Sequence, residues 1–575
     1  MASRRSRRGL AAEILRDPAA RRQVRALADR TGTAPEEVGR RVARHLRGLV
    51  AGQGAFSAPL LRAVAVAVYG RPEVTPATRA ELVRLRRSGA RPLVFLPAHR
   101  SYADSLLLSV VLHDAGLPAT YRLAGENLAF WPLSSIARRS GVVFIRRDFG
   151  NDRAYQLAVR VYLAHLLRQG AHLEWYAEGG RTRTGRLRRP RLGFLRELLT
   201  ALDQGDAPGA RIVPLAFTYG LLPEARALVD EDGGATKPAE GPRLLLRRLT
   251  ADRRARVRPA RLGLGALHSP YDETAPSAAP GRWAAARALG ARLTYEWNLA
   301  TPLTGEALVC LALAAGHRRP RGLDALAREL RFLVEYATRR SIPVIDGDAV
   351  TAAAPLRALL DRLCEAGVLT GTLHDDAPRY WIGPDQHHLA AYHRHAGGHH
   401  FLDRCVAELG VLAADGDPTG FPLRMHALLA HAFALPPRSE FLDLVAGAAS
   451  TLGAPVPAED GPRLLGRQPF LLAHRLLGAP LEAHLDVALC SRPPDPRTGP
   501  PRPIPCRPRR WPESRSRALH TAGLAAATEA GRWRDGPTPP PRARPYLDEL
   551  RHLVDRLADI ASLDDRIDQT FPEER

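Results

Sequence analysis

Apolar residues recur at helical spacing in the first 89 residues and again from about residue 301 to 490. This period, with few runs of β-branched residues, predicts an N-terminal helical region over 1–89 and a mainly helical C-terminal region over 301–490. Residues 491–575 are expected to form a tail rich in proline and arginine that ends in an amphipathic helix, Tyr546–Ala561. The middle of the chain has a different pattern.

Between residues 90 and 300, short apolar runs alternate with amphipathic stretches. Runs bounded by turn or polar residues predict strands at Leu93–Pro97, Gly141–Arg147, His172–Ala177 and Arg211–Tyr219. Helices are expected at Asp104–His113 and Ala154–Arg168. Strands that alternate with helices are typical of α/β folds. We therefore predict an α/β domain over 90–300, a mixed sheet flanked by helices, between the two helical regions.

Two apolar stretches come closest to a membrane span, Phe56–Tyr69, which Arg62 interrupts, and Ala307–Ala315. A helix needs about 20 apolar residues to cross a bilayer, so we expect both stretches to be core helices. The basic N-terminus, Met1 to Arg8, lacks the apolar run of a signal peptide. Any membrane contact is therefore expected to be peripheral.

The first stretch that carries chemistry is His99-Arg100-Ser101-Tyr102-Ala103-Asp104, directly after the first predicted strand. Ligands of α/β sheets bind at the carboxyl ends of strands, so the position suits an active site. Five residues along one helix place two side chains about 140° apart. His99 and Asp104 can therefore meet only if His99 lies in the loop and Asp104 in the first helical turn, with Ser101 as N-cap. Asp104 would then hold one imidazole nitrogen while the other removes a proton from a hydroxyl. Alternatively, Ser101 and Asp104 form only a capping box.

Three further blocks follow later strands. Arg146 and Arg147 close an apolar run, and paired arginines either clamp a phosphate or form a solvated strand end. The third block is Glu178-Gly179-Gly180-Arg181-Thr182-Arg183-Thr184-Gly185. Its glycines let the backbone approach a ligand, and its arginines offer forked donors to phosphate oxygens. A flexible basic turn has the same composition and is the alternative. The fourth, Ile212–Ala216, contains Pro214, which implies an edge strand or a bulge, with plain core as the alternative.

Together, the order, spacing and content of these blocks resemble the four blocks of the glycerolipid acyltransferases. The membrane-bound bacterial glycerol-3-phosphate acyltransferase family is the most similar. Ala124–Pro132, with the sequence AGENLAFWP, resembles that family's connection between the first two blocks. The resemblance is dense from about residue 92 to 220 and thinner past Lys237 and Glu240 into the C-terminal helices.

This resemblance implies roles for individual residues. His99 is the general base and Asp104 its partner. The glycerol-phosphate site is formed by Arg147, Glu178, Gly179, Arg181 and Thr182, and Pro214 belongs to the fourth block. Arg146 is also expected to bind substrate, because it stands beside Arg147. Two positions depart from the family, which usually has serine at Thr182 and glutamate at Gly220. Either departure can alter substrate preference.

The resemblance also implies the reaction. A fatty acyl group passes from acyl-CoA or acyl carrier protein to the sn-1 hydroxyl of glycerol 3-phosphate, giving lysophosphatidate without a covalent enzyme intermediate. No metal or cofactor is required. The expected location is the cytoplasmic face of the cell membrane, bound peripherally to its anionic surface. Within the class, a dihydroxyacetone-phosphate or lysophosphatidate acyltransferase is the alternative.

The formal net charge of +23 favours anionic partners. Lys237 is the only lysine among the 83 basic residues, so codon usage accounts for much of the arginine content. A basic nucleic-acid-binding protein is the alternative from another class, and two helices with a hairpin at Leu369–Ile382 would make a winged-helix-like unit for it. Aromatic residues make up only 6% of the chain, which argues against RNA stacking and leads us to expect no nucleic-acid partner. An inactive membrane-bound scaffold is a third possibility.

Cysteine and histidine spacing give no metal signal. The five cysteines are scattered without a CxxC pair, which fits a reducing cytoplasm and suggests neither disulfides nor zinc. A dense histidine cluster is more tempting; its members are His387, His388, His393, His395, His399 and His400. Their spacing matches no known ligand pattern, and we predict no metal there.

Overall fold

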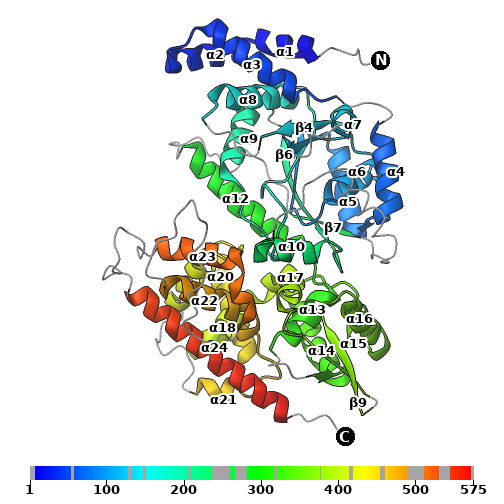
Figure 1. Cartoon of the computed structure of the whole chain (residues 1–575), viewed down its shortest axis with the longest axis vertical. Coiled ribbons are helices and arrows are strands. Elements are labelled where there is room, and N and C mark those ends of the chain that lie inside the picture. Colours follow the sequence, from blue (N-terminus) through cyan, green and yellow to red (C-terminus); the bar gives the residue numbers. More distant parts are fainter. Residues whose placement is uncertain are drawn as a thin grey trace. The chain divides into compact units, whose positions relative to one another are not determined.

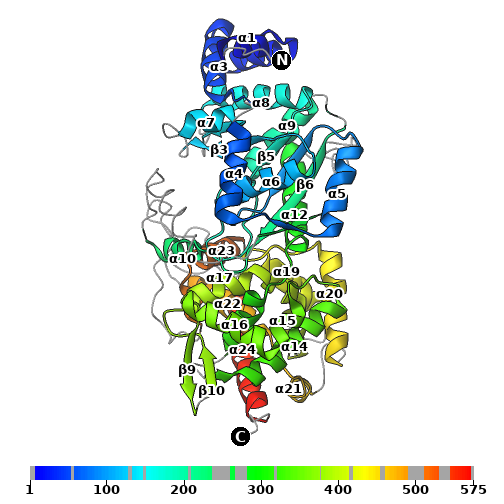
Figure 2. The ribbon, with the colours of Figure 1, turned by 90° about the vertical axis from the view of Figure 1, so that its right-hand side faces the viewer.

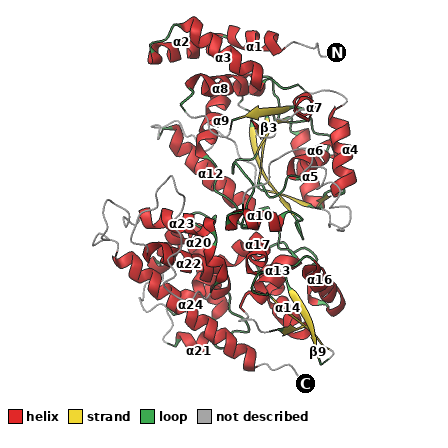
Figure 3. Ribbon diagram, in the orientation of Figure 1, coloured by secondary structure: helices red, strands yellow, loops and turns green. Residues whose placement is uncertain are grey.

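The computed structural model describes residues 7–52, 57–126, 133–146, 151–204, 207, 209–235, 260–265, 281–315, 320–375, 377–412, 419–453, 460–489, 511–529 and 544–570. The chain divides into two compact units. The first comprises residues 1–181, 188–219 and 238–300, and the second residues 182–187, 220–237 and 301–575. Figure 1 labels their elements, Figure 2 gives a side view, and Figure 3 shows helices around the strands of the first unit.

A seven-stranded sheet forms the centre of the first unit, in the order β1-β7-β6-β2-β5-β3-β4. Its strands are β1 (Glu73–Val74), β2 (Leu93–Pro97), β3 (Tyr121–Gly125), β4 (Val142–Ile145), β5 (Leu173–Trp175), β6 (Arg211–Thr218) and β7 (Arg261–Leu264). Neighbours pair in parallel except β6 and β7, which are antiparallel. The predicted mixed sheet is confirmed, and the four predicted strands correspond to β2, β4, β5 and β6.

Helices cover both faces of this sheet (Figures 1 and 2). One face carries α5 (Pro76–Arg87) and α6 (Asp104–Asp114); the other carries α8 (Arg153–Arg168), α9 (Leu192–Gln204) and α12 (Arg282–Leu299). Trp297 anchors α12, because its indole is fully buried and donates to the carbonyl of Leu96 at 2.7 Å. The predicted helices at 104–113 and 154–168 are α6 and α8.

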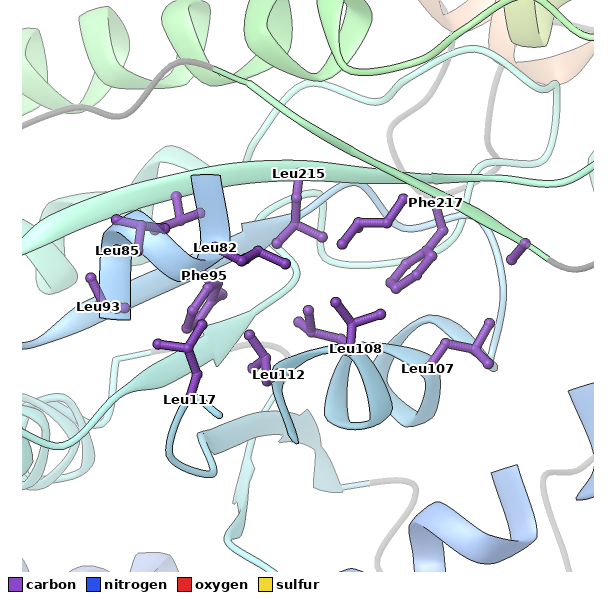
Figure 4. Close-up of a cluster of buried hydrophobic side chains, with 14 of the residues drawn as sticks. Leu82, Leu85, Leu93, Phe95, Leu107, Leu108, Leu112, Leu117, Leu215 and Phe217 are labelled. Carbon is purple, nitrogen blue, oxygen red and sulfur yellow. The ribbon is translucent and has the colours of Figure 1, made fainter. Parts of the chain in front are cut away.

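The core between α5, α6 and the sheet is aliphatic and phenylalanine-rich (Figure 4). It includes Leu82 of α5, Phe95 of β2, Leu108 of α6, and Leu215 and Phe217 of β6. Each fully buried side chain of this size stabilises the fold by roughly 1.5–3 kcal/mol relative to an exposed one. This core therefore fixes the carboxyl ends of β2 and β6 against the start of α6.

The N-terminal helices belong to the first unit. They are α1 (Arg7–Arg16), α2 (Pro18–Thr31), α3 (Pro35–Leu49) and α4 (Ser57–Tyr69), while the short α7 (Leu133–Arg139) connects β3 and β4. Asp17 caps α2, accepting from the backbone of Ala19 at 2.7 Å, and Pro18 occupies the first helical position. The helices α1, α2 and α3 pack together, and α3 packs against α8.

The second unit is mainly helical. Its helices are α10 (Ala225–Gly233), α13 (Gly305–Ala312), α14 (Leu323–Arg339), α15 (Gly347–Thr351), α16 (Ala353–Glu365), α17 (His387–Gly397), α18 (Leu402–Val411), α19 (Gly420–Leu429), α20 (Arg438–Leu452), α21 (Gly461–Leu465), α22 (Ala473–Leu489), α23 (Arg517–Glu529) and α24 (Arg544–Thr570). The predicted hairpin is β9 (Thr370–His374) with β10 (Ala377–Trp381), and β8 (Arg321–Gly322) completes a three-stranded sheet.

The structure confirms the interpretation of one apolar segment and corrects that of another. Ala307–Ala315 was expected to be core, and α13 within it is indeed buried along its whole length. Phe56–Tyr69 was also expected to be core, but Leu60 of α4 is 60% exposed. Among the described residues, no helix combines the length and hydropathy needed to cross a membrane.

The structure also corrects the expected position of Pro214, since β6 lies in the middle of the sheet, between β7 and β2. The register of β6 with β7 begins only at Leu215. At Pro214 itself, the carbonyl accepts from the backbone of Gly265 at 3.0 Å, just past the end of β7. The N–H that proline lacks is therefore not needed for strand pairing, so the residue is tolerated without an edge.

Candidate active site

His99 and Asp104 meet at the carboxyl end of β2. His99 lies in the loop after the strand, and α6 begins at Asp104. The imidazole Nδ1 is 3.1 Å from Oδ2 of Asp104. This is the arrangement that the sequence predicted. Ser101 is not the N-cap as expected: Ala103 holds that position, and the Ser101 hydroxyl instead accepts from the backbone of Ala103 at 3.1 Å.

The carboxylate of Asp104 is fully buried and organises the loop. Besides His99, Oδ2 accepts from the backbone N–H groups of Arg100 at 2.8 Å and Ser101 at 2.9 Å. Oδ1 accepts from the hydroxyl of Tyr219 at 2.6 Å. Because Ala103 and not Ser101 is the N-cap, the capping box considered from the sequence does not form, and the bond to Ser101 instead closes the loop around the carboxylate. These donors satisfy the buried carboxylate without a cation.

The imidazole of His99 is held on a second side by an aromatic ring. Tyr176, which follows β5, packs against it with ring centroids 4.3 Å apart. The hydroxyl of Tyr176 donates to Glu174 at 3.2 Å, and burial holds the pKa of this tyrosine well above its usual range. With Nδ1 facing a carboxylate, the tautomer that carries its proton on Nδ1 leaves the lone pair of Nε2 for a substrate. The His99 side chain is 21% exposed, so it remains accessible.

Glu178 links the third block to the loop of residues 98–103, which we call the catalytic loop because it carries His99, the proposed base. Its Oε1 accepts from the backbone of His99 and its Oε2 from the backbone of Arg188, both at 2.7 Å. Burial raises the pKa of this carboxyl to about 7, and the two backbone hydrogen bonds oppose that rise. Glu178 therefore positions the backbone of His99, and a direct contact with substrate stays a prediction.

Arg181 lies against Tyr102 of the catalytic loop. Its guanidinium carbon is 3.5 Å from the ring centroid, and Nη2 donates to the Tyr102 hydroxyl at 2.6 Å. The side chain is buried, and Nη1 has no hydrogen-bond partner within the described part of the chain. A buried guanidinium nitrogen without an acceptor is costly, and a phosphate oxygen would supply the missing one.

Comparison with known proteins agrees with this geometry. Residues 71–218 match the family model Acyltransferase, and residues 240–490 match the model named Glycerol-3-phosphate acyltransferase C-terminal region. The proteins named "Putative acyltransferase plsB1" of Mycobacterium tuberculosis and Mycobacterium bovis are each 32% identical over 493 residues, which cover 81% of this chain and 78% of theirs. The chain belongs to the glycerol-3-phosphate acyltransferase family.

A second relative is more similar over a shorter stretch. The glycerol-3-phosphate acyltransferase of Pasteurella multocida is 41% identical over 168 residues, which cover 29% of this chain and 21% of that protein. The predicted family is thus confirmed, and with it an acyltransferase that acts on glycerol 3-phosphate.

In this family member, the later residues of the third block form a turn within the second unit, which the chain enters at Thr182 and leaves after residue 187. The buried hydroxyl of Thr182 donates to the carbonyl of Arg186 and so closes the turn. Since only the hydroxyl makes this bond, threonine in place of the family's serine preserves it. Gly185 has φ +77°, and a Cβ there would lie 1.9 Å from the carbonyl oxygen of Tyr392 in α17.

The arginines of the second block are less clearly tied to a phosphate. Arg146 donates to Asp152 at 3.1 Å, and its guanidinium lies 4.4 Å from the ring centroid of Tyr155. Both partners are at the start of α8, so the described contacts of Arg146 anchor the end of β4 to that helix. Arg147 lies outside the described residues, and its place in the site stays a prediction.

At Gly220, where the family usually has glutamate, the structure leaves little space for a side chain. A Cβ at Gly220 would lie 2.8 Å from Oε1 of Glu306, a buried residue of α13. A glutamate at this position would therefore need to displace Glu306 and would bring two carboxylates together. The neighbouring carboxylate gives a physical reason for glycine in this chain.

The histidine cluster is part of the packing of the second unit. His395 of α17 is buried against the turn, with Nδ1 3.0 Å from the carbonyl of Thr184 and Nε2 2.9 Å from Nη2 of Arg186. Burial holds the pKa of His395 well below its usual range, so it stays neutral, donating from Nδ1 and accepting at Nε2. Within the described residues, no three potential ligands gather as a metal site.

Two residues of the site were not identified from the sequence. Tyr219 and Tyr176 each follow directly after an observed strand, β6 and β5, and lay inside the strands predicted from the sequence. Their position at the carboxyl end of a strand was the available signal. Nothing in the spacing distinguishes such a tyrosine from a core residue, because its partner in the site, Asp104 for Tyr219 and His99 for Tyr176, lies far away in sequence.

Proposed function

We propose that the protein transfers a fatty acyl group from acyl-CoA or acyl carrier protein to the sn-1 hydroxyl of glycerol 3-phosphate, giving lysophosphatidate in the first step of phospholipid synthesis. The single observation that carries this proposal is the pair of His99 and the buried Asp104 at the end of β2. Family membership supports glycerol 3-phosphate as the acceptor. The choice of acyl-CoA or acyl carrier protein as donor rests only on the sequence motifs that resemble the family.

In the proposed reaction, Nε2 of His99 takes the proton of the sn-1 hydroxyl as its oxygen attacks the thioester carbonyl. Asp104 stabilises the imidazolium that forms. The tetrahedral intermediate then collapses, the carbon–sulfur bond breaks, and the leaving thiolate takes the proton from the imidazolium. The products are the ester and a free thiol, and the enzyme returns to its starting state. No step requires a metal or a redox cofactor.

Arg181 binds the phosphate of the acceptor in this mechanism. Its unpartnered Nη1 donates to a phosphate oxygen, while Tyr102 fixes the guanidinium plane. Because Tyr102 belongs to the loop that carries His99, the phosphate contact and the base are held by one segment. Fixing both ends of a small acceptor places its hydroxyl against the base, which is catalysis by positioning.

The proposed location is the cytoplasmic face of the cell membrane, bound peripherally. The formal net charge of +23 favours an anionic surface, and the lipid product must leave into a bilayer. Attraction of this kind weakens as salt screens the charges. High salt should therefore release part of the protein from membranes.

The experiment that tests the proposed function compares acceptors. Purified protein is given an acyl-CoA with glycerol 3-phosphate, dihydroxyacetone phosphate or lysophosphatidate, and the lipid products are identified. We expect the highest kcat/KM with glycerol 3-phosphate. A higher value with either of the other two acceptors would leave the family unchanged and replace the named substrate.

A further inference from the structure

The helix α4 has an apolar face that the rest of the first unit leaves uncovered. Leu60 is 60% exposed and Val64 is 38% exposed, and Ala63 and Ala67 are exposed as well. Their spacing of three and four residues places all four on one side of the helix. The opposite side faces the unit, where Ala65 is fully buried and α4 packs against α6. A surface helix normally has the reverse pattern, with polar residues outside.

The short helix α7 extends this face. It contacts α4, and its Ile136 is 38% exposed (Figures 1 and 2). We define the docking face as the exposed residues of these two helices; they are Pro59, Leu60, Ala63, Val64, Ala67, Ser135, Ile136 and Arg139. Scattered exposed leucines are ordinary, but a contiguous apolar set indicates an interaction surface.

The charges beside the docking face are almost all positive. Neither helix contains an acidic residue; α4 carries Arg62, and α7 ends in Arg138 and Arg139. Glu126, the residue after β3, interacts electrostatically with Arg138. Apolar side chains with arginines around them complement a bilayer that carries anionic headgroups.

The size of the docking face distinguishes a bilayer from a second copy of the chain. A helix of 13 residues is about 20 Å long, and one side of it about 10 Å wide, so α4 offers on the order of 200 Å². A stable protein interface buries about 800 Å² on each partner. An interfacial helix needs no such area, because a few inserted side chains and headgroup contacts suffice when several act together.

We propose that the docking face binds the surface of an anionic lipid bilayer, with Leu60, Val64 and Ile136 inserted at the boundary between headgroups and acyl chains and the neighbouring arginines on the lipid phosphates. This inference rests on the proposed function, because it names the surface that a peripheral acyltransferase uses. It places the membrane against α4, whose partner α6 begins at the catalytic Asp104. The catalytic loop thus stays in the part of the fold that meets the lipid phase.

The test uses the full-length protein and sedimentation with vesicles of phosphatidylcholine and phosphatidylglycerol. The variant Leu60→Glu/Val64→Glu should bind about tenfold more weakly or worse, since it exchanges two inserted side chains for charges that anionic lipid repels. Ile136→Glu on α7 should weaken binding in the same direction. The matched control is Leu373→Glu on β9, where leucine is 68% exposed, and it should bind like wild type.

Two further measurements separate the possible outcomes. Activity with a short-chain, water-soluble acyl-CoA should be unchanged in all variants, because none of these residues belongs to the catalytic loop. If the α4 and α7 variants sediment with vesicles like wild type, the docking face is refuted. A wild-type dimer that the double variant dissociates would also refute it, by making this face a self-association surface. Failure of wild type itself to bind vesicles would overturn the proposed membrane location, whereas failure to acylate glycerol 3-phosphate would overturn the proposed function.

Discussion

The buried carboxylate of Asp104 accepts from four donors, and His99 is only one of them. Two of the others come from the backbone of the same loop, which locks the loop around the carboxylate. The fourth, the hydroxyl of Tyr219, comes from the end of β6 and links Asp104 to the neighbouring strand. The contribution of an individual hydrogen bond in this site can therefore be tested with a single substitution.

We predict that Tyr219→Phe lowers kcat about ten- to a hundredfold, because a hydrogen bond to a charged group is worth about 1.5–3 kcal/mol. The KM for glycerol 3-phosphate should change little, since Tyr219 acts through Asp104. The acidic limb of the pH–rate profile should move to higher pH, because the imidazolium then faces a carboxylate with one donor fewer. Steady-state kinetics across pH would measure both effects.

The matched control is Tyr162→Phe in α8. Its hydroxyl is also buried and accepts from the backbone of Ala51 at 3.0 Å, remote in sequence from the catalytic loop. This variant should lose stability without losing kcat. Equal kinetics in the two variants would show that Tyr219 is only a packing residue.

Arg181 gives a second prediction at this scale. Arg181→Gln should raise the KM for glycerol 3-phosphate about ten- to a hundredfold, the cost of one charge-assisted hydrogen bond, and leave the KM for the acyl donor unchanged. Lysine should restore activity only in part, because it cannot fork. Arg183→Lys is the control within the same block, since Arg183 is half exposed and pairs with Glu231 at 3.2 Å. An unchanged acceptor KM in Arg181→Gln would remove Arg181 from the phosphate site.

At the scale of elements, the turn of residues 182–187 depends on glycine. We predict that Gly185→Ala destabilises the second unit, because φ +77° costs a non-glycine residue about 1–2 kcal/mol and the added Cβ meets the Tyr392 carbonyl. Thermal unfolding should begin several degrees lower. Gly193→Ala near the start of α9 is the control, because nothing lies within 4 Å of its Cβ; it should be neutral or slightly stabilising. An unchanged melting temperature in Gly185→Ala would contradict the packing described for the turn.

The elements also show what the sequence could and could not predict. Apolar runs located β2, β4, β5 and β6, because buried parallel strands are continuous apolar segments. They missed β1, β3 and β7, which bury few apolar side chains. Helical periodicity identified α4 but not its exposed side, since an apolar helix has the same pattern in a core and at an interface. Likewise, spacing placed His99 beside Asp104, while contacts such as Tyr219 with Asp104 span 115 positions and have no local pattern.

At the scale of the whole molecule, buried histidines make stability depend on pH. Burial lowers the pKa of His172, His393 and His400 to about 4 each. Their ordinary pKa is about 6.5, so between pH 4 and 6.5 the unfolded chain binds more protons than the folded protein. The free energy of unfolding therefore falls as pH is lowered through this window, by up to about 1.4 kcal/mol per pH unit for each group. Glu178 acts in the opposite sense, because its raised pKa, about 7, makes the folded state bind the extra proton between about pH 4.5 and 7.

We predict a lower unfolding midpoint at pH 5 than at pH 7, since the histidines outnumber the carboxyl that opposes them. His400→Gln should reduce this pH dependence while its amide keeps a donor near the Thr301 carbonyl, now 2.7 Å from Nε2 of His400. Calorimetry at several pH values would measure the change. A midpoint that rises on acidification would show that these histidines are protonated in the folded protein.

The central claim is that His99 removes the proton of the glycerol 3-phosphate hydroxyl. The most direct test is the rate of lysophosphatidate formation by His99→Ala under saturating substrates, with circular dichroism to show that the variant is folded. General base catalysis contributes typically 10²–10⁴-fold, so the account predicts a loss of kcat in that range. A folded His99→Ala protein with near-normal turnover would contradict it.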